Sequence, residues 1–175
     1  MQFKAEIFSR EDYPNFDLFL SRRANPILKD AYNKRIKMSE TDFVEYLILV
    51  SVTEERETTN TQNSKCPKYV GVAFAHWLHS SDVLSTCMEA VLTPYRRKGV
   101  GSMLMEAAKS LVSTEGATAL LSYLDDPMDP AHVAFMEKNG FVMDPTVWAR
   151  CVERAWRWTP PSSNDVTPDH VVAPA

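Results

Sequence analysis

The sequence has few cysteines and no long hydrophobic run. Its three cysteines, Cys66, Cys87 and Cys151, stand far apart, so they fit neither a disulfide framework nor a clustered metal site and are typical of a reducing compartment. No apolar stretch approaches the roughly 20 residues that a membrane-spanning helix needs. The charges in MQFKAEIFSRED do not match a secretory signal. We therefore expect a cytoplasmic protein with no membrane partner and no metal.

An excess of positive charge is also missing. The chain has 19 lysines and arginines against 23 aspartates and glutamates, a net charge of −4. No overall field therefore attracts nucleic acid, and we expect no nucleic-acid partner. The 175 residues, 45% of them hydrophobic, suffice for the core of one domain. We expect this domain over residues 1–158, followed by a disordered tail rich in proline, serine and aspartate over 159–175.

Hydrophobic patterning predicts a series of short strands. Alternating or continuous apolar residues predict strands at 3–8, 46–52, 69–79, 84–92, 117–124 and 147–158. The polar segment 53–68 predicts a hairpin loop, so the strands on either side of it belong to an antiparallel meander. The segment 117–124 is apolar without alternation, which is typical of a central strand covered on both faces.

Helical patterns separate these strands. Residues 14–40 are predicted to be helical with a break at Asn25-Pro26, because the residue before a proline disfavours α geometry. After Gly99, apolar residues recur at helical spacing until Gly116, which predicts the helix end. The sequence therefore predicts an α/β domain with a mixed sheet.

Glycine is scarce, yet two of the five glycines lie one residue apart in YRRKGVGSML, residues 95–104. Three cations precede them, and the amphipathic helix follows. A helix N-terminus has unpaired N–H groups and a partial positive charge, and glycine lets the main chain approach a ligand closely. The stretch predicts a diphosphate site. A solvated basic turn is the structural alternative. A Rossmann or Walker loop does not fit, because the third glycine of G-x-G-x-x-G and the G-K-[ST] sequence are absent.

Two stretches carry a resemblance to a known family. Arg96-Arg97-Lys98-Gly99-Val100-Gly101 resembles motif A of the GNAT acyltransferases, R/Q-x-x-G-x-G/A. DPAHVAFMEKNGF, residues 129–141, resembles the family's N-x-x-A-x-x-x-Y-x-K-x-G-F, and here Asp129 and Pro130 are predicted to begin a helix that Gly140 ends. The resemblance implies the GNAT fold, a mostly antiparallel sheet flanked by helices with splayed central strands. It also implies an N-acetyltransferase that moves an acetyl group from acetyl-CoA to a primary amine of a small molecule or peptide by direct attack, as a monomer or homodimer.

The resemblance further implies where acetyl-CoA, the co-substrate, would bind. The pantetheine arm would lie between strands 84–92 and 117–124 and pair with the backbone of Glu89, Ala90 and Val91. The diphosphate would lie on the glycine loop. The expected coenzyme contacts are Ala90, Val91, Arg96, Arg97, Lys98, Gly99, Val100, Gly101, Ser102, Asp129 and Met136.

Acidic residues are the candidate bases for amine attack. A period of two puts Glu89 on one strand face with Ser85 and Cys87, and Glu89 is our tentative base. Asp125 and Asp126 are the alternatives, and acidic residues in a strand-to-helix loop are more often turn residues. The alternative to a catalytic role is that Glu89 is a solvated strand residue.

Three other side chains bear on the chemistry. Met136 stands where the family usually has a tyrosine that acts as the general acid, and a thioether cannot donate a proton. That departure supports an alternative function, a GNAT scaffold that binds acyl-CoA or another ligand without acetyl transfer. We expect His132, in the first turn of its helix, to face solvent, and Cys87 to be a buried strand residue and not a nucleophile.

Overall fold

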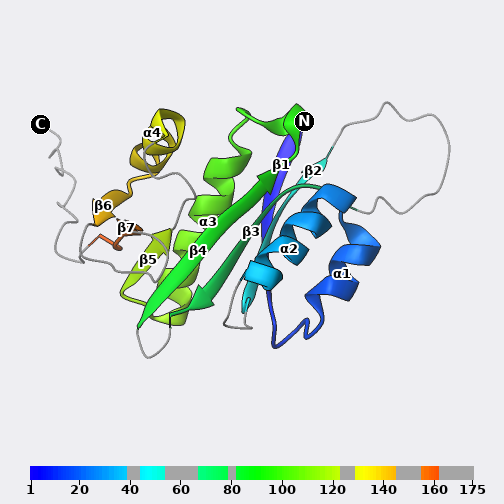
Figure 1. Cartoon of the computed structure of the whole chain (residues 1–175), viewed down its shortest axis with the longest axis horizontal. Coiled ribbons are helices and arrows are strands. Elements are labelled where there is room, and N and C mark those ends of the chain that lie inside the picture. Colours follow the sequence, from blue (N-terminus) through cyan, green and yellow to red (C-terminus); the bar gives the residue numbers. More distant parts are fainter. Residues whose placement is uncertain (39–43, 54–66, 79–81, 123–128, 145–154, 162–175) are drawn as a thin grey trace, which may run out of the picture.

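The computed structural model describes residues 1–38, 44–53, 67–78, 82–122, 129–144 and 155–161. Within these residues, a seven-stranded sheet in the order β1-β2-β3-β4-β5-β7-β6 forms the centre of the molecule (Figure 1). The elements are β1 (Gln2–Ser9), α1 (Phe16–Arg23), α2 (Pro26–Met38), β2 (Tyr46–Thr53), β3 (Lys68–Trp77), β4 (Val83–Val91), the 3₁₀ turn η1 (Thr93–Tyr95), α3 (Val100–Glu115), β5 (Ala119–Ser122), α4 (Pro130–Lys138), β6 (Val142–Asp144) and β7 (Ala155–Trp158).

The sheet is mixed and mostly antiparallel, as predicted. Strands β1 to β4 pair antiparallel in sequence order, and β7 pairs antiparallel with both β5 and β6. The β4–β5 pair is parallel, and α3 makes the crossover that a parallel pair requires. The glycine loop therefore follows the last strand of an antiparallel meander.

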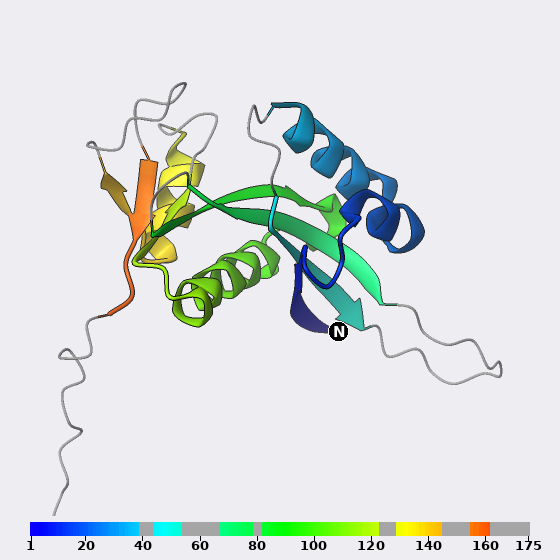
Figure 2. The ribbon, with the colours of Figure 1, turned by 90° about the horizontal axis from the view of Figure 1, so that it is seen from below.

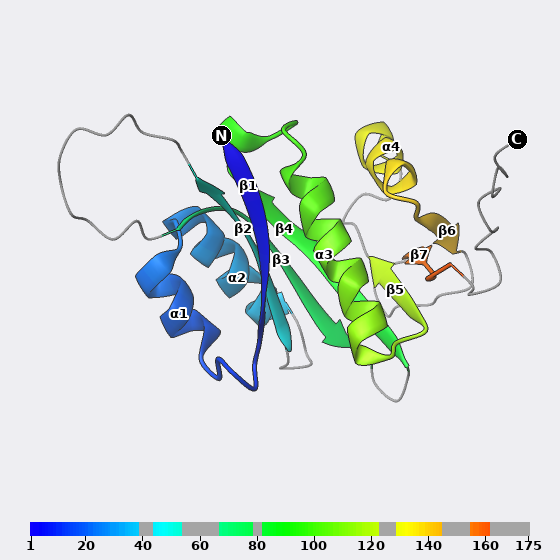
Figure 3. The ribbon, with the colours of Figure 1, turned by 180° about the vertical axis from the view of Figure 1, so that it is seen from behind.

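Helices cover both faces of the sheet. Helices α1 and α2 lie on one face, and α3 lies on the other (Figures 2 and 3). Tyr32 of α2 packs on Phe74 of β3, with ring centroids 5.6 Å apart. On the opposite face, a Cβ added to Gly71 of β3 would lie 2.7 Å from Val100 of α3. The first turn of α3 is thus held directly against the sheet.

The helix ends follow from the sequence. Asn15 caps α1 by accepting a hydrogen bond from the Leu18 N–H at 2.9 Å, and α2 begins at Pro26, so the predicted break is confirmed. Gly99 and Gly116 bound α3, both with a left-handed backbone. Within the described residues, no helix combines the length and the hydrophobicity needed to cross a membrane.

Some boundaries differ from the predictions. Gly140 was predicted to cap α4, but the cap is Asn139, and Gly140 follows it with φ at +74°. The short strand β6 was not predicted as a separate element. Of the predicted strand 147–158, β7 (Ala155–Trp158) is described, and 145–154 lie outside the described residues. So do most of the predicted loop 53–68 and residues 162–175 of the predicted tail.

Strand β4 extends past its neighbour. In the described residues, Val83–Thr86 pair with Ala119–Ser122 of β5, whereas β4 runs on to Val91. On its other side, β4 pairs with β3, and the register there places Val72 opposite Ala90 but Ala73 opposite Met88. Glu89 is therefore the extra residue of a β-bulge.

Candidate functional site

A cleft of about 570 Å³ lies where the end of β4, the N-terminus of α3 and one face of α4 meet. All three elements that form it come from the half of the chain with the two motifs. The described lining residues are Ala90, Val91, Arg96, Arg97, Gly99, Gly101, Ser102, His132, Phe135 and Lys138.

The turn between β4 and α3 has an unusual backbone. Arg97 has φ of +59° and Gly99 has φ of +85°, so two residues of this short turn are left-handed. Such a backbone costs a non-glycine residue on the order of 1–3 kcal/mol. The side chain of Arg96 helps to fix the turn, because its Nε donates a hydrogen bond to the Val91 carbonyl at 3.1 Å. The turn thus brings two arginines to the mouth of the cleft.

The N-terminus of α3 presents unpaired backbone N–H groups. The cap residue Gly99 has no side chain with which to accept a hydrogen bond. The helical ladder begins with the Met103 N–H, which donates to the Gly99 carbonyl at 3.0 Å. The N–H groups of Val100, Gly101 and Ser102 precede this bond and have no acceptor within the helix. Together with the helix dipole they form an anion-binding end.

Helix α4 contributes the third wall. His132, Phe135 and Lys138 follow one another at three-residue spacing and so share one side of the helix. Asp129 begins the helix as predicted: its Oδ1 accepts a hydrogen bond from the Ala131 N–H at 2.9 Å. Its Oδ2 lies 3.7 Å from Nδ1 of His132. The side chain of His132, which we expected to face solvent, is half-exposed and also lines the cleft.

A comparison with protein-family models finds a similarity over the part of the chain that forms the cleft. The model of the acetyltransferase (GNAT) domain matches residues 64–143, which include β3, β4, α3, β5 and α4. Solved structures with a similar sheet and helix arrangement include acetyltransferases of the GNAT family. Residues 64–143 are therefore similar to the GNAT acetyltransferase domain, and the fold is that of GNAT acetyltransferases.

Three solved structures illustrate the GNAT fold of this chain. An acetyltransferase of the GNAT family from Staphylococcus aureus Mu50 is 12% identical, with a TM-score of 0.57, and the match covers 90% of this chain and 99% of that one. PaiA N-acetyltransferase from Thermoplasma acidophilum, solved with coenzyme A, is 11% identical, with a TM-score of 0.53 and coverages of 91% and 100%. YhbS from Escherichia coli, also solved with coenzyme A, is 14% identical, with a TM-score of 0.53 and coverages of 91% and 82%. Comparison with curated proteins finds no match.

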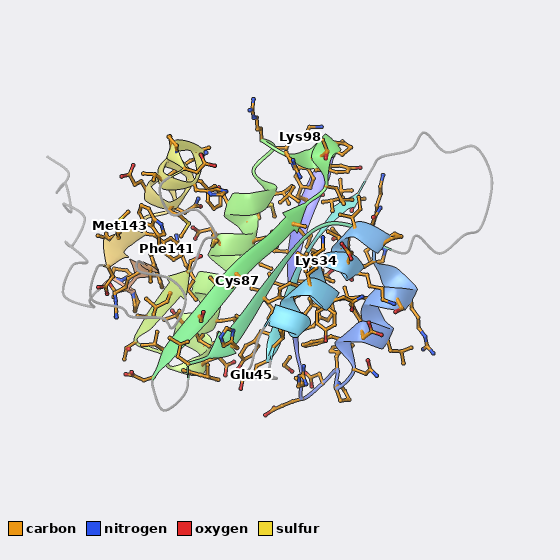
Figure 4. All side chains as sticks on the ribbon, in the orientation of Figure 1. Lys34, Glu45, Cys87, Lys98, Phe141 and Met143 are labelled. Carbon is orange, nitrogen blue, oxygen red and sulfur yellow. The ribbon has the colours of Figure 1, made fainter. Side chains whose placement is uncertain are left out.

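Most of the coenzyme residues that the sequence predicts lie together in this GNAT domain. Those that line the cleft are Ala90, Val91, Arg96, Arg97, Gly99, Gly101 and Ser102. The side chain of Val100 is instead buried against Gly71. The Lys98 ammonium lies 5.7 Å from the Tyr95 ring centroid, at the end of the sheet shown at the top of Figure 4. Met136 is fully buried in the core.

Helix α4 of the GNAT domain also places residues that the sequence did not assign to the coenzyme. They are His132, Phe135 and Lys138. Their three-residue spacing from Asp129 was a usable signal, because a helix aligns such positions on one side. The side of α4 that faces β4 is set by tertiary packing, however, and cannot be derived from the local sequence.

The candidate bases are placed only in part. Ser85 and Cys87 share a face, and Cys87 is opposite Phe74, so both lie on the side of the sheet that α2 covers. Figure 4 labels Cys87 on β4. The bulge interrupts the two-residue alternation before Glu89. The alternation therefore does not place Glu89 on the strand face of Ser85 and Cys87. The Glu89 side chain, Asp125 and Asp126 lie outside what the structure describes.

Proposed function

We propose that this GNAT domain transfers an acetyl group from acetyl-CoA to a primary amine of a small molecule or a peptide. One observation carries the proposal: the cleft joins the unpaired N–H groups of α3 to the part of β4 beyond its described pairs with β5. The first feature fits a diphosphate, and the second fits an extended arm. Coenzyme A has both parts joined in this way.

The diphosphate would lie at the start of α3. The N–H groups of Val100, Gly101 and Ser102 would donate to its oxygens, and the helix dipole favours its negative charge. Arg96 and Arg97 add two full positive charges at the mouth of the cleft. A hydrogen bond between charged groups contributes about 1.5–3 kcal/mol, so this end supplies much of the binding free energy.

The pantetheine arm would follow β4 inward. Ala90 and Val91 line the cleft and lie beyond the residues of β4 that pair with β5. An extended ligand can hydrogen-bond to such a strand as an added strand does. A backbone N–H of residues 89–91 would then donate to the thioester oxygen, which gains negative charge as the amine attacks. A donor of this kind contributes about 3 kcal/mol to the transition state.

The acceptor amine would come from the face that α1 and α2 cover. Glu89 is the proposed base, with Asp125 and Asp126 as alternatives, and Glu89→Gln is the variant that tests the first assignment. We also propose, from the cysteine usage, a cytoplasmic location, and from the family a monomer or homodimer.

Calorimetric titration with acetyl-CoA tests the diphosphate site. Gly101→Asp puts a carboxylate beside the diphosphate, and we expect the dissociation constant to rise at least about 100-fold; Arg97→Ala should raise it about 10-fold. Lys34→Ala is the control, because Lys34 is an exposed cation of α2 that pairs with Asp30 at 2.9 Å. Equal affinity of wild type and Gly101→Asp would refute the assignment.

Release of free coenzyme A with a panel of amines tests the transfer. We expect release above the rate of hydrolysis with at least one primary amine. The burial of Met136 at the family's acid position favours the second function, a scaffold that binds acyl-CoA without transfer. Binding without release on any amine would replace our proposal by that function.

A further inference from the structure

Acetyl transfer leaves a thiolate that must be protonated. When the amine nitrogen attacks the thioester carbon, the C–S bond breaks and its electron pair stays on the sulfur. A positioned general acid that protonates the sulfur in that step typically accelerates the reaction about 10²- to 10⁴-fold. The walls of the cleft determine which groups are available for this task.

Among the described residues of the cleft, the chemistry of the side chains leaves one suitable proton donor. Arginine does not release its proton, and lysine does so only at high pH. Serine is a weak acid, and Phe135 has no acidic hydrogen. Imidazole both gives and regains a proton near neutral pH. His132, in the first turn of α4, is the imidazole of this cleft.

A carboxylate lies near the ring of His132. Asp129 is held in place because its Oδ1 accepts the Ala131 N–H at the helix cap. Its Oδ2 lies 3.7 Å from Nδ1 of His132, on the side of the ring away from Nε2. This distance is that of an ion pair with a protonated ring and is longer than a hydrogen bond. His132 shares the cleft with Ala90 and Val91, along which the arm would run.

We propose that His132 is the general acid of this GNAT domain; the inference rests on the function proposed above. The Nε2–H of the imidazolium gives its proton to the departing sulfur, which leaves as the free thiol of coenzyme A. The amine gives up one proton to the base or to water, and His132 regains a proton from water. Met136 cannot take this role, because it is buried and carries no acidic hydrogen. Cys87 is placed on the face that α2 covers.

The test compares catalysis with binding. We expect His132→Gln and His132→Ala to lower kcat about 100-fold or more, while the dissociation constant of acetyl-CoA stays within about threefold. Added imidazole should restore part of the rate of His132→Ala but not of His132→Gln, because the glutamine fills the space. Asp129→Asn keeps the helix cap and should lower kcat about 10-fold. Glu137→Gln, on an exposed residue of the same helix, is the control and should leave kcat unchanged.

The outcomes separate this inference from the proposed function. If wild type transfers acetyl groups and His132→Gln has an unchanged kcat, His132 is not the acid. If the loss is confined to acetyl-CoA affinity and imidazole restores nothing, His132 is a phosphate ligand, and the inference is wrong while the proposed function stands. If wild type binds acetyl-CoA but releases no coenzyme A with any amine, both fall. Circular dichroism and melting of each variant confirm that it folds.

Discussion

At the scale of the residue, Gly71 determines how closely α3 approaches the sheet. An added Cβ would lie 2.7 Å from Val100 Cγ1 and 3.3 Å from Leu104 Cδ1. Val100 is the first residue of the helix whose N–H groups form the anion-binding end. A side chain at position 71 would therefore push away the part of α3 on which the proposed site depends.

Replacing Gly71 by alanine should destabilise the protein and weaken coenzyme binding. We expect a loss of about 1–3 kcal/mol in the free energy of unfolding from overpacking, measured by urea denaturation, and a higher dissociation constant for acetyl-CoA. Gly116→Ala is the control: it has open space and costs about 1 kcal/mol through its positive φ alone, at the far end of α3. A Gly71→Ala protein as stable as wild type would contradict the close packing.

At the scale of the element, Asn15 shows what a single cap contributes. Its Oδ1 satisfies the Leu18 N–H at the start of α1, a helix of 8 residues. Short helices depend on such bonds because they have few internal ones. We expect Asn15→Ala to lower the free energy of unfolding by about 1 kcal/mol and Asn15→Ser to preserve it, by urea denaturation at constant m-value. Equal losses in the two variants would show that the cap bond is unimportant.

The elements also show how far the sequence predicts the fold. Strands β1 to β4 and the described α-helices could be predicted, because each has a clear period, a proline break or a glycine end. The strand β6 has 3 residues, and its first, Val142, is 70% exposed. It has no local strand pattern and is a strand because it pairs with β7.

The candidate site was predictable where one segment builds it. The glycine loop and its arginines are contiguous, so a motif finds them. The α4 wall and the bulge at Glu89 arise from contacts between distant segments. A period of two cannot anticipate an extra residue in one strand, because the partner strand decides where the register shifts. Met136 illustrates the same limit: the motif includes it, but packing buries it in the core.

At the scale of the whole molecule, the two ends of the sheet differ. Lys98 lies at one end and Glu45 at the other (Figure 4). A second cleft, of about 750 Å³, lies at the end with Glu45 and is lined by Ser9, Arg10, Glu11, Asp12, Glu45, Tyr46, Trp77 and Glu115. Burial raises the pKa of Tyr46 above its ordinary value, and the nearby Glu115 carboxylate raises it further.

The raised pKa of Tyr46 predicts a loss of stability at alkaline pH. Burial also raises the pKa of Tyr32. Above pH of about 10, the unfolded chain releases phenol protons that the folded protein retains, so the free energy of unfolding falls as the pH rises. Below that pH, both states keep these protons and the two tyrosines cause no pH dependence. Urea denaturation across pH 8 to 11 should show a smaller alkaline decrease for Tyr46→Phe than for wild type, and an identical decrease would contradict the shift.

The left-handed backbone at Arg97 has a consequence for engineering. A survey of the chain for thermostabilising changes would choose glycine here, since glycine adopts this conformation without steric cost. Arg97→Gly would relieve the backbone strain, but it would also remove a guanidinium from the cleft. Under the proposed function it would therefore weaken the binding of coenzyme A. A library aimed at heat resistance should therefore hold position 97 constant.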